Sequence, residues 1–141
     1  MKRSILTILA AIGSAIANWL GGWDTALQTL LIFMAVDYLT GLIVAGVFKK
    51  SGKSETGALE SRAGLKGLIR KLASLLIVLV AVCLDRLIGG SYARMAAIIF
   101  FCANEGISIL ENIGLMGVPY PAFLKNALEV LRKKGDEGKY E

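Results

Sequence analysis

Long apolar blocks alternate with short charged segments along the chain, which is the pattern of helices that cross a membrane. A helix needs about 20 residues to cross a hydrocarbon core of roughly 30 Å. Four blocks are long enough, and the predicted spans are residues 4–23, 25–48, 72–92 and 95–116. We therefore predict an all-α integral membrane protein with about four transmembrane helices, organised as one membrane domain over residues 1–141.

The first block, residues 4–23, has two further interpretations. Lys2 and Arg3, the apolar stretch that follows and the run Ala15-Ile16-Ala17 also fit a secretory signal peptide with its cleavage site. Alternatively, the segment lies at the membrane interface. Cleavage or an interfacial position would leave three spans.

The segment between the second and third spans, residues 49–71, is predicted to be a basic connection on the cytoplasmic side. Its first part is polar and rich in Gly and Ser. Further on, basic residues recur at four-residue spacing beside an apolar face, which indicates a short amphipathic helix on the membrane surface. The basic residues assigned to this surface are Arg62, Lys66, Arg70 and Lys71.

The C-terminal segment, residues 118–141, opens with two prolines that suit a turn between helices. From residue 122 to residue 134 the apolar positions keep helical spacing, but thirteen residues are too few to cross a bilayer. We expect this amphipathic tail to lie on the inner surface or to pack against a neighbouring chain, with a frayed end from Gly135 onward.

Composition and charge support the membrane class and set the orientation. Hydrophobic residues make up 55% of the 141 positions and charged residues only 19%, which excludes an ordinary cytosolic domain. With four spans and both termini inside, fourteen of the sixteen Lys and Arg residues lie on the cytoplasmic side, as the positive-inside rule requires. The basic residues therefore follow topology, and we predict no nucleic-acid partner.

The residues that usually carry catalysis are missing. The chain contains no His, which removes the commonest general base and metal ligand, and both cysteines lie inside apolar stretches. We find no nucleotide-binding or nucleophile motif. We predict no enzymatic activity, no metal and no cofactor.

Ionisable groups within the predicted spans are candidates for function. Asp37 and Glu105 lie near the middle of their spans, where charged side chains are rare and face a bundle interior or water. Polar residues of the fourth span gather on an arc of roughly 120° at helical spacing. These candidates for lining a pore are Asn104, Glu105, Ser108, Glu111 and Asn112. No basic group is expected at the same depth.

Small and hydrogen-bonding residues on two spans suggest helix contacts, because small side chains let membrane helices approach closely. The candidates for packing or oligomer contacts are Asp37, Thr40, Gly41 and Ala45 on the second span, with Gly13 and Ala17 on the first. Packing within one chain accounts for them equally well.

Several motifs resemble one family. The segments that carry the resemblance are residues 23–41, which end in Asp37-Tyr38-Leu39-Thr40-Gly41, together with residues 64–71, 104–112 and 117–125. Their order and spacing over residues 20–132 are similar to those of the toxin-secretion/phage-lysis holins. The resemblance implies a phage-encoded protein of the bacterial inner membrane that accumulates, oligomerises and opens lesions. Its functional partner would be an endolysin or a toxin, without stable binding, and such proteins often have three spans.

Two other classes of protein stay open. A small ion channel or transporter would use Asp37 and Glu105 and give selective flux without release of macromolecules. A structural subunit would dock a cytoplasmic partner through its basic segments and leave permeability unchanged. The motifs favour a holin, while composition alone does not distinguish the three.

Overall fold

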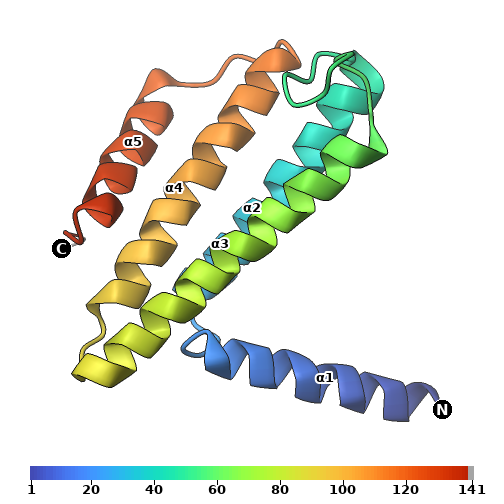
Figure 1. The fold of residues 1–141 in the computed structure, drawn as a ribbon. Coiled ribbons are helices and arrows are strands. Elements are labelled where there is room, and N and C mark those ends of the chain that lie inside the picture. Colours follow the sequence, from blue (N-terminus) through green and yellow to red (C-terminus); the bar gives the residue numbers. More distant parts are fainter. Residues whose placement is uncertain (140–141) are drawn as a thin grey trace.

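The structure, a computed structural model, describes residues 1–139, and Tyr140 and Glu141 of the predicted tail lie outside the described residues. Within the described range the chain is helical. In chain order the helices are α1 (Lys2–Trp19), α2 (Thr25–Ile43), which continues into the π-helical turn η1 (Val44–Phe48), α3 (Ser61–Ile88), α4 (Tyr92–Leu115) and α5 (Ala122–Asp136). Helices α2, α3 and α4 pack together, while α1 extends away from them (Figure 1).

Three helices of the described chain are long and apolar enough to cross a membrane: Thr25–Phe48, Ser61–Ile88 and Tyr92–Leu115. The predicted count of four spans is not confirmed. Helix α1 has 18 residues, and Lys2, Arg3 and Asn18 lower its mean hydropathy. None of its residues is buried, and its Ile and Leu side chains stay exposed.

The bundle formed by α2, α3 and α4 has two chemically different halves. Its apolar core includes Leu27 and Leu30 of α2, Val78 of α3 and Ile98 of α4. This core lies toward the start of α2 and α4, which we call the Arg94 end. The opposite end, which carries the connection of residues 49–60, is called the loop end. The half nearer to it contains the buried polar residues Asp37 and Asn112.

Arg94 fixes the sharp bend between α1 and α2. Its guanidinium donates to the carbonyl oxygens of Leu20 (2.5 Å) and Gly22 (3.1 Å) and to both carboxylate oxygens of Asp24 (2.7 and 3.0 Å). Gly21 has φ +93°, and a Cβ there would overlap the Arg94 side chain. A glycine is therefore required at the bend, both for its backbone angle and for space.

Two carboxylates complete the Arg94 end. Asp85 of α3 accepts from the backbone N–H groups of Ala93 and Arg94, each at 2.9 Å, and so caps the start of α4. Asp24 caps α2 by accepting from Leu27 N–H at 2.9 Å. The hydrogen bonds from Arg94 hold the pKa of Asp24 below its usual 3.8 against the opposing effect of burial. The pair therefore stabilises the fold above that pH and loses this effect as the pH falls through the lowered pKa.

Two predicted surface segments take different positions. The basic segment before the third span is the first part of one continuous helix, α3, which begins at Ser61. Helix α5 reaches Asp136 and lies alongside α4 (Figure 1), and Gly135, expected in a frayed end, is buried. The first segment continues into the third span as predicted, whereas α5, predicted to lie on the inner surface or against a neighbouring chain, packs on α4 of its own chain.

Replacing Arg94 tests the bend. In Arg94→Gln the carbonyls of Leu20 and Gly22 and the carboxylate of Asp24 lose their shared cationic donor, so we expect faster amide hydrogen exchange over residues 18–24, read by mass spectrometry in detergent. Arg62→Gln, at an exposed position on α3, is the matched control and should leave these amides unchanged. Equal protection in wild type and Arg94→Gln would contradict the role of Arg94.

Candidate functional site

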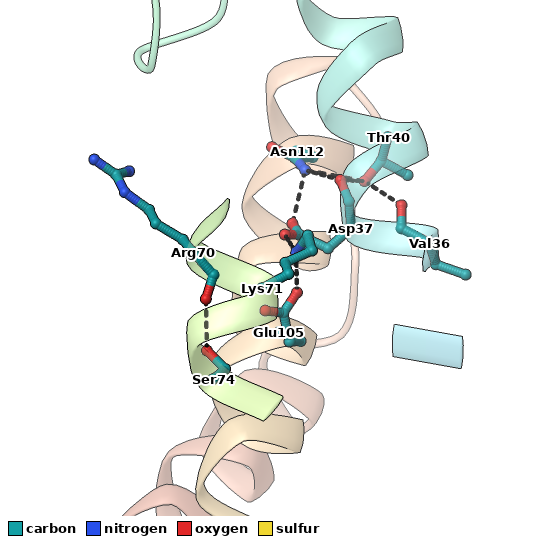
Figure 2. A network of polar contacts seen from close by, with 8 residues as sticks. All are labelled: Val36, Asp37, Thr40, Arg70, Lys71, Ser74, Glu105 and Asn112. Carbon is teal, nitrogen blue, oxygen red and sulfur yellow. Dashed lines mark hydrogen bonds and ion pairs between the residues drawn. The ribbon is translucent and has the colours of Figure 1, made fainter. Parts of the chain in front are cut away.

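A lysine joins the three spanning helices in the loop half of the bundle. The ammonium group of Lys71, on α3, lies 2.6 Å from Asp37 Oδ2 on α2 and also pairs with Glu105 Oε2 on α4. The side chains of Lys71, Asp37 and Glu105 are 14%, 5% and 13% exposed. Figure 2 shows Lys71 between the two carboxylates. We call these three residues the ion cluster.

An asparagine extends the ion cluster toward the loop end. Asn112 of α4 is buried, and its Nδ2 donates to Asp37 Oδ1 at 3.2 Å and to Thr40 Oγ1 at 2.9 Å. Thr40 in turn donates to the carbonyl of Val36 at 2.8 Å. Asp37 therefore has a polar partner on each side, from α3 and from α4, as a buried carboxylate requires.

Small residues let α3 approach α2 near the ion cluster. A Cβ on Gly64 would lie 3.4 Å from the hydroxyl oxygen of Tyr38, and a Cβ on Gly67 would lie 3.8 Å from the Tyr38 ring. Beside this contact is a cavity of about 330 Å³ between α2, α3, α4 and the connection of residues 49–60. Asp37, Lys71 and Glu105 line this cavity, so the ion cluster borders a space that water can enter.

The predicted polar arc of α4 is divided between the bundle and its surroundings. Glu105 and Asn112 face α2 and α3 and have partners there. Asn104 and Ser108 are partly exposed and line the cavity, whereas Glu111 is exposed. Ser108 also forms a side-chain hydrogen bond with Asp37, so three of the five members of the arc make contacts within one chain. The role of the arc as a pore lining stays a prediction.

The predicted contact residues are divided as well. Asp37, Thr40 and Gly41 face Asn112, since a Cβ on Gly41 would lie 3.8 Å from Asn112 Nδ2, and Ala45 is buried. On α1, Ala17 is partly exposed, and Gly13 is exposed with no atom near its Cβ position.

The expectation that no basic group lies at the depth of Asp37 and Glu105 is wrong. Lys71 was grouped with Arg62, Lys66 and Arg70, which are exposed. Those three recur every four residues, whereas Lys71 follows Arg70 directly and so lies about 100° around the helix. Figure 2 shows Arg70 pointing away from the ion cluster that Lys71 enters. This offset within the basic run was the available sequence signal.

The chemistry of the ion cluster is electrostatic. Among the described residues no group of three or more metal-ligating side chains gathers. The ammonium of Lys71 fills the space between Asp37 and Glu105, so each carboxylate is neutralised by a fixed cation. Through its two ion pairs, with Asp37 on α2 and Glu105 on α4, Lys71 links the three helices.

Comparison with known proteins identifies the family. Residues 14–133 match the bacteriophage holin family. The chain belongs to this family. It is 34% identical over 112 residues to a protein named "Probable holin" from Bacillus phage phi105, which covers 79% of this chain and 77% of the relative. The three apolar helices and holin-family membership together make it a membrane protein.

Two further relatives come from Clostridium perfringens. An uncharacterised protein of Clostridium perfringens strain 13 is 45% identical over 122 residues, 84% of each chain. An uncharacterised 14.9 kDa protein in the nagH 3′ region of Clostridium perfringens is 42% identical over 128 residues, 89% of this chain and 91% of the relative. No solved structure matches the chain.

Removing the cation tests the ion cluster. Lys71→Met leaves two buried carboxylates facing each other without a counter-ion, so we expect the free energy of unfolding to fall by about 3–5 kcal/mol. Lys66→Met, at an exposed position on the same helix, should change it by less than about 0.5 kcal/mol. Denaturant titration in mixed micelles measures both. A similar small effect for the two variants would contradict the structural role of Lys71.

Proposed function

We propose that this protein is a holin that oligomerises in the bacterial inner membrane and opens lesions through which an endolysin or toxin leaves the cytoplasm. The observation that carries the proposal is the family match over residues 14–133, together with the relative from a Bacillus phage. Family membership points to a membrane protein without enzymatic activity, and the proposal requires none. The endolysin or toxin needs only to pass through the lesion, and stable binding to the holin is not required.

Helix dimensions support an assembly of many copies. A helix is about 10 Å across, so the three spanning helices of one chain leave no passage for a folded enzyme. A ring of helices around a 40 Å opening needs on the order of 16 lining helices by the same diameter. Release of a folded protein therefore depends on copies of this chain gathering around a shared opening.

The orientation proposed for the spanning helices follows their basic residues. The loop end carries the basic residues of the 49–60 connection and of the start of α3, so we place this end in the cytoplasm. The start of α5 is on the same side, because α4 ends there. A cytoplasmic N-terminus additionally requires α1 to cross the bilayer as a fourth span.

Contacts between copies are proposed through α1. Within one chain Asp37, Thr40 and Gly41 face α4, so they are occupied in the closed bundle. Gly13 and Ala17 lie one turn apart on α1, which extends from the bundle (Figure 1). Small residues at this spacing are typical of contacts between membrane helices.

A small channel or transporter is the second candidate function. The cavity beside Asp37 and Glu105 is the observation that favours it. The position of Lys71 argues against it, because the ammonium already occupies the place between the carboxylates that a transported cation would take. A holin remains the better supported function.

Co-expression with a wall hydrolase tests the proposal. We expect abrupt lysis of a bacterium that expresses this protein together with a cytosolic hydrolase lacking an export signal, and escape of a cytosolic reporter enzyme. Neither protein alone should lyse the culture. Loss of membrane potential without lysis would instead indicate a channel, and no change in permeability would indicate a docking subunit.

Crosslinking tests the contact through α1. Gly13→Leu fills the space at the proposed contact, so we expect a loss of crosslinked multimers in isolated membranes, because the helices can no longer approach closely. Ala11→Leu, also exposed but on the opposite side of α1, is the matched control and should crosslink like the wild type. Normal multimers of Gly13→Leu would exclude this contact.

A further inference from the structure

The cavity beside the ion cluster opens at the loop end, between α3 and the connection of residues 49–60. The cationic residues that line it there are Lys53 of the connection and Lys66 and Arg70 of α3, which we call the mouth cations. All of them are exposed. Figure 2 shows the Arg70 side chain leaving α3 on the side away from the ion cluster. The cavity therefore connects the ion cluster at its inner end to a basic surface at its mouth.

The charges that line the cavity are unequally paired. Its carboxylates have partners within the chain. Asp37 and Glu105 bind Lys71. Glu60 accepts from the backbone N–H of Thr56 at 3.2 Å and from its hydroxyl at 3.0 Å. By contrast, the salt bridges of the described chain involve none of the mouth cations. The mouth thus carries positive charge that no carboxylate of the described chain neutralises.

A serine in the same cavity lacks a partner as well. Ser54 lines the cavity, and its hydroxyl oxygen is buried without a hydrogen-bond partner in the described part of the chain. Buried hydroxyl groups are normally hydrogen-bonded, because leaving one unsatisfied costs free energy. Cations without counter-ions and a hydroxyl without an acceptor are complementary to one kind of group, an anion with several acceptor oxygens. A phosphate is such a group.

The surroundings of the mouth favour a lipid as the source of the phosphate. Leu65, Leu68 and Ile69 are exposed on α3 beside the mouth cations, and α3 is one of the helices able to cross the membrane. Acyl chains are the natural contact for these side chains. The cavity volume of about 330 Å³ is also typical of a small-molecule site. Basic pockets between membrane helices on the cytoplasmic side bind anionic headgroups.

We propose that the mouth of this cavity binds the phosphate of an anionic phospholipid from the cytoplasmic leaflet. The mouth cations pair with the phosphate, the hydroxyl of Ser54 donates to it, and the acyl chains lie along Leu65 and Leu68. The ion cluster keeps its own counter-ions, so the headgroup does not need Lys71. The choice of leaflet rests on the proposed orientation, whereas the phosphate chemistry is independent of the holin function.

Lipid binding by the full-length protein tests the site. The protein is purified in detergent and titrated with phosphatidylglycerol, and native mass spectrometry measures the lipid bound per chain. We expect saturable binding, with an affinity for phosphatidylcholine at least about tenfold lower, because its choline cation opposes the mouth cations. Inorganic phosphate and the chain-free headgroup glycerophosphoglycerol should bind more weakly than phosphatidylglycerol, since they lack the acyl contacts.

Removing mouth cations should weaken this binding. In Lys53→Gln/Arg70→Gln we expect the affinity for phosphatidylglycerol to fall at least about tenfold. Lys50→Gln/Arg62→Gln is the matched control, because it removes the same two residue types from the same two segments at exposed positions outside the cavity. Its affinity should stay within about threefold of wild type. Equal losses in the two double variants would show a general attraction to the basic surface and overturn the site.

Replacing the buried hydroxyl gives a second readout that leaves the charge unchanged. Ser54→Ala removes the donor, so we expect the affinity for phosphatidylglycerol to fall by about threefold to tenfold. Ser61→Ala, at an exposed position outside the cavity, should bind like the wild type. Wild-type affinity in Ser54→Ala would overturn the placement of the phosphate in the cavity.

The outcomes separate this site from the holin function. Equal affinity for phosphatidylglycerol and phosphatidylcholine would overturn the anionic site, and inorganic phosphate bound as tightly as phosphatidylglycerol would overturn the lipid as its source. Either result leaves the holin proposal standing. Conversely, failure of the co-expression test for lysis leaves the lipid site untouched, because the binding measurement requires no lesion.

Discussion

The ammonium group of Lys71 decides how the three spanning helices lie against one another in the loop half of the bundle. Asp37 and Glu105 cannot face hydrocarbon, and they repel each other unless a cation lies between them. Because Lys71 comes from the third helix, neutralising the two carboxylates also brings α3 against α2 and α4. The contact of Tyr38 with the glycine positions 64 and 67 depends on that approach.

At the Arg94 end of the bundle, the guanidinium group of Arg94 likewise holds separate segments of the chain together. Arg94 binds two backbone carbonyls and the carboxylate of Asp24, so it joins the turn after α1 to the start of α4. Between the two cations lies the apolar core around Leu30, Val78 and Ile98, which gives the helices cohesion but little directional preference. The charged contacts at both ends therefore determine how the helices align along their lengths, which apolar packing alone does not determine.

Sequence reasoning predicted what depends on composition along one helix and missed what depends on contact between helices. The spans near residues 25–48 and 95–116 follow from uninterrupted apolar length, and the structure has helices there. Lys71 looked like part of a surface run because Arg70 precedes it, and its partners lie 34 residues away in either direction. The docked position of α5 was likewise unpredictable, because Gly135 looks like a helix terminator until the backbone of Phe100 is placed against it.

A buried ion cluster suits the proposed holin function, in which the bundle first forms intact and later rearranges. An intact buried ion pair adds little stability over apolar packing, because the loss of hydration offsets most of the attraction. Removing one partner is costly, so the cluster favours one arrangement of α2, α3 and α4 over others in which the charges are unpaired. Water removes the cost of unpaired charges, since it can solvate Asp37, Lys71 and Glu105 separately. The cavity borders all three charged residues. Under the proposed holin function, water that reaches this cavity would therefore solvate the cluster and favour separation of the helices.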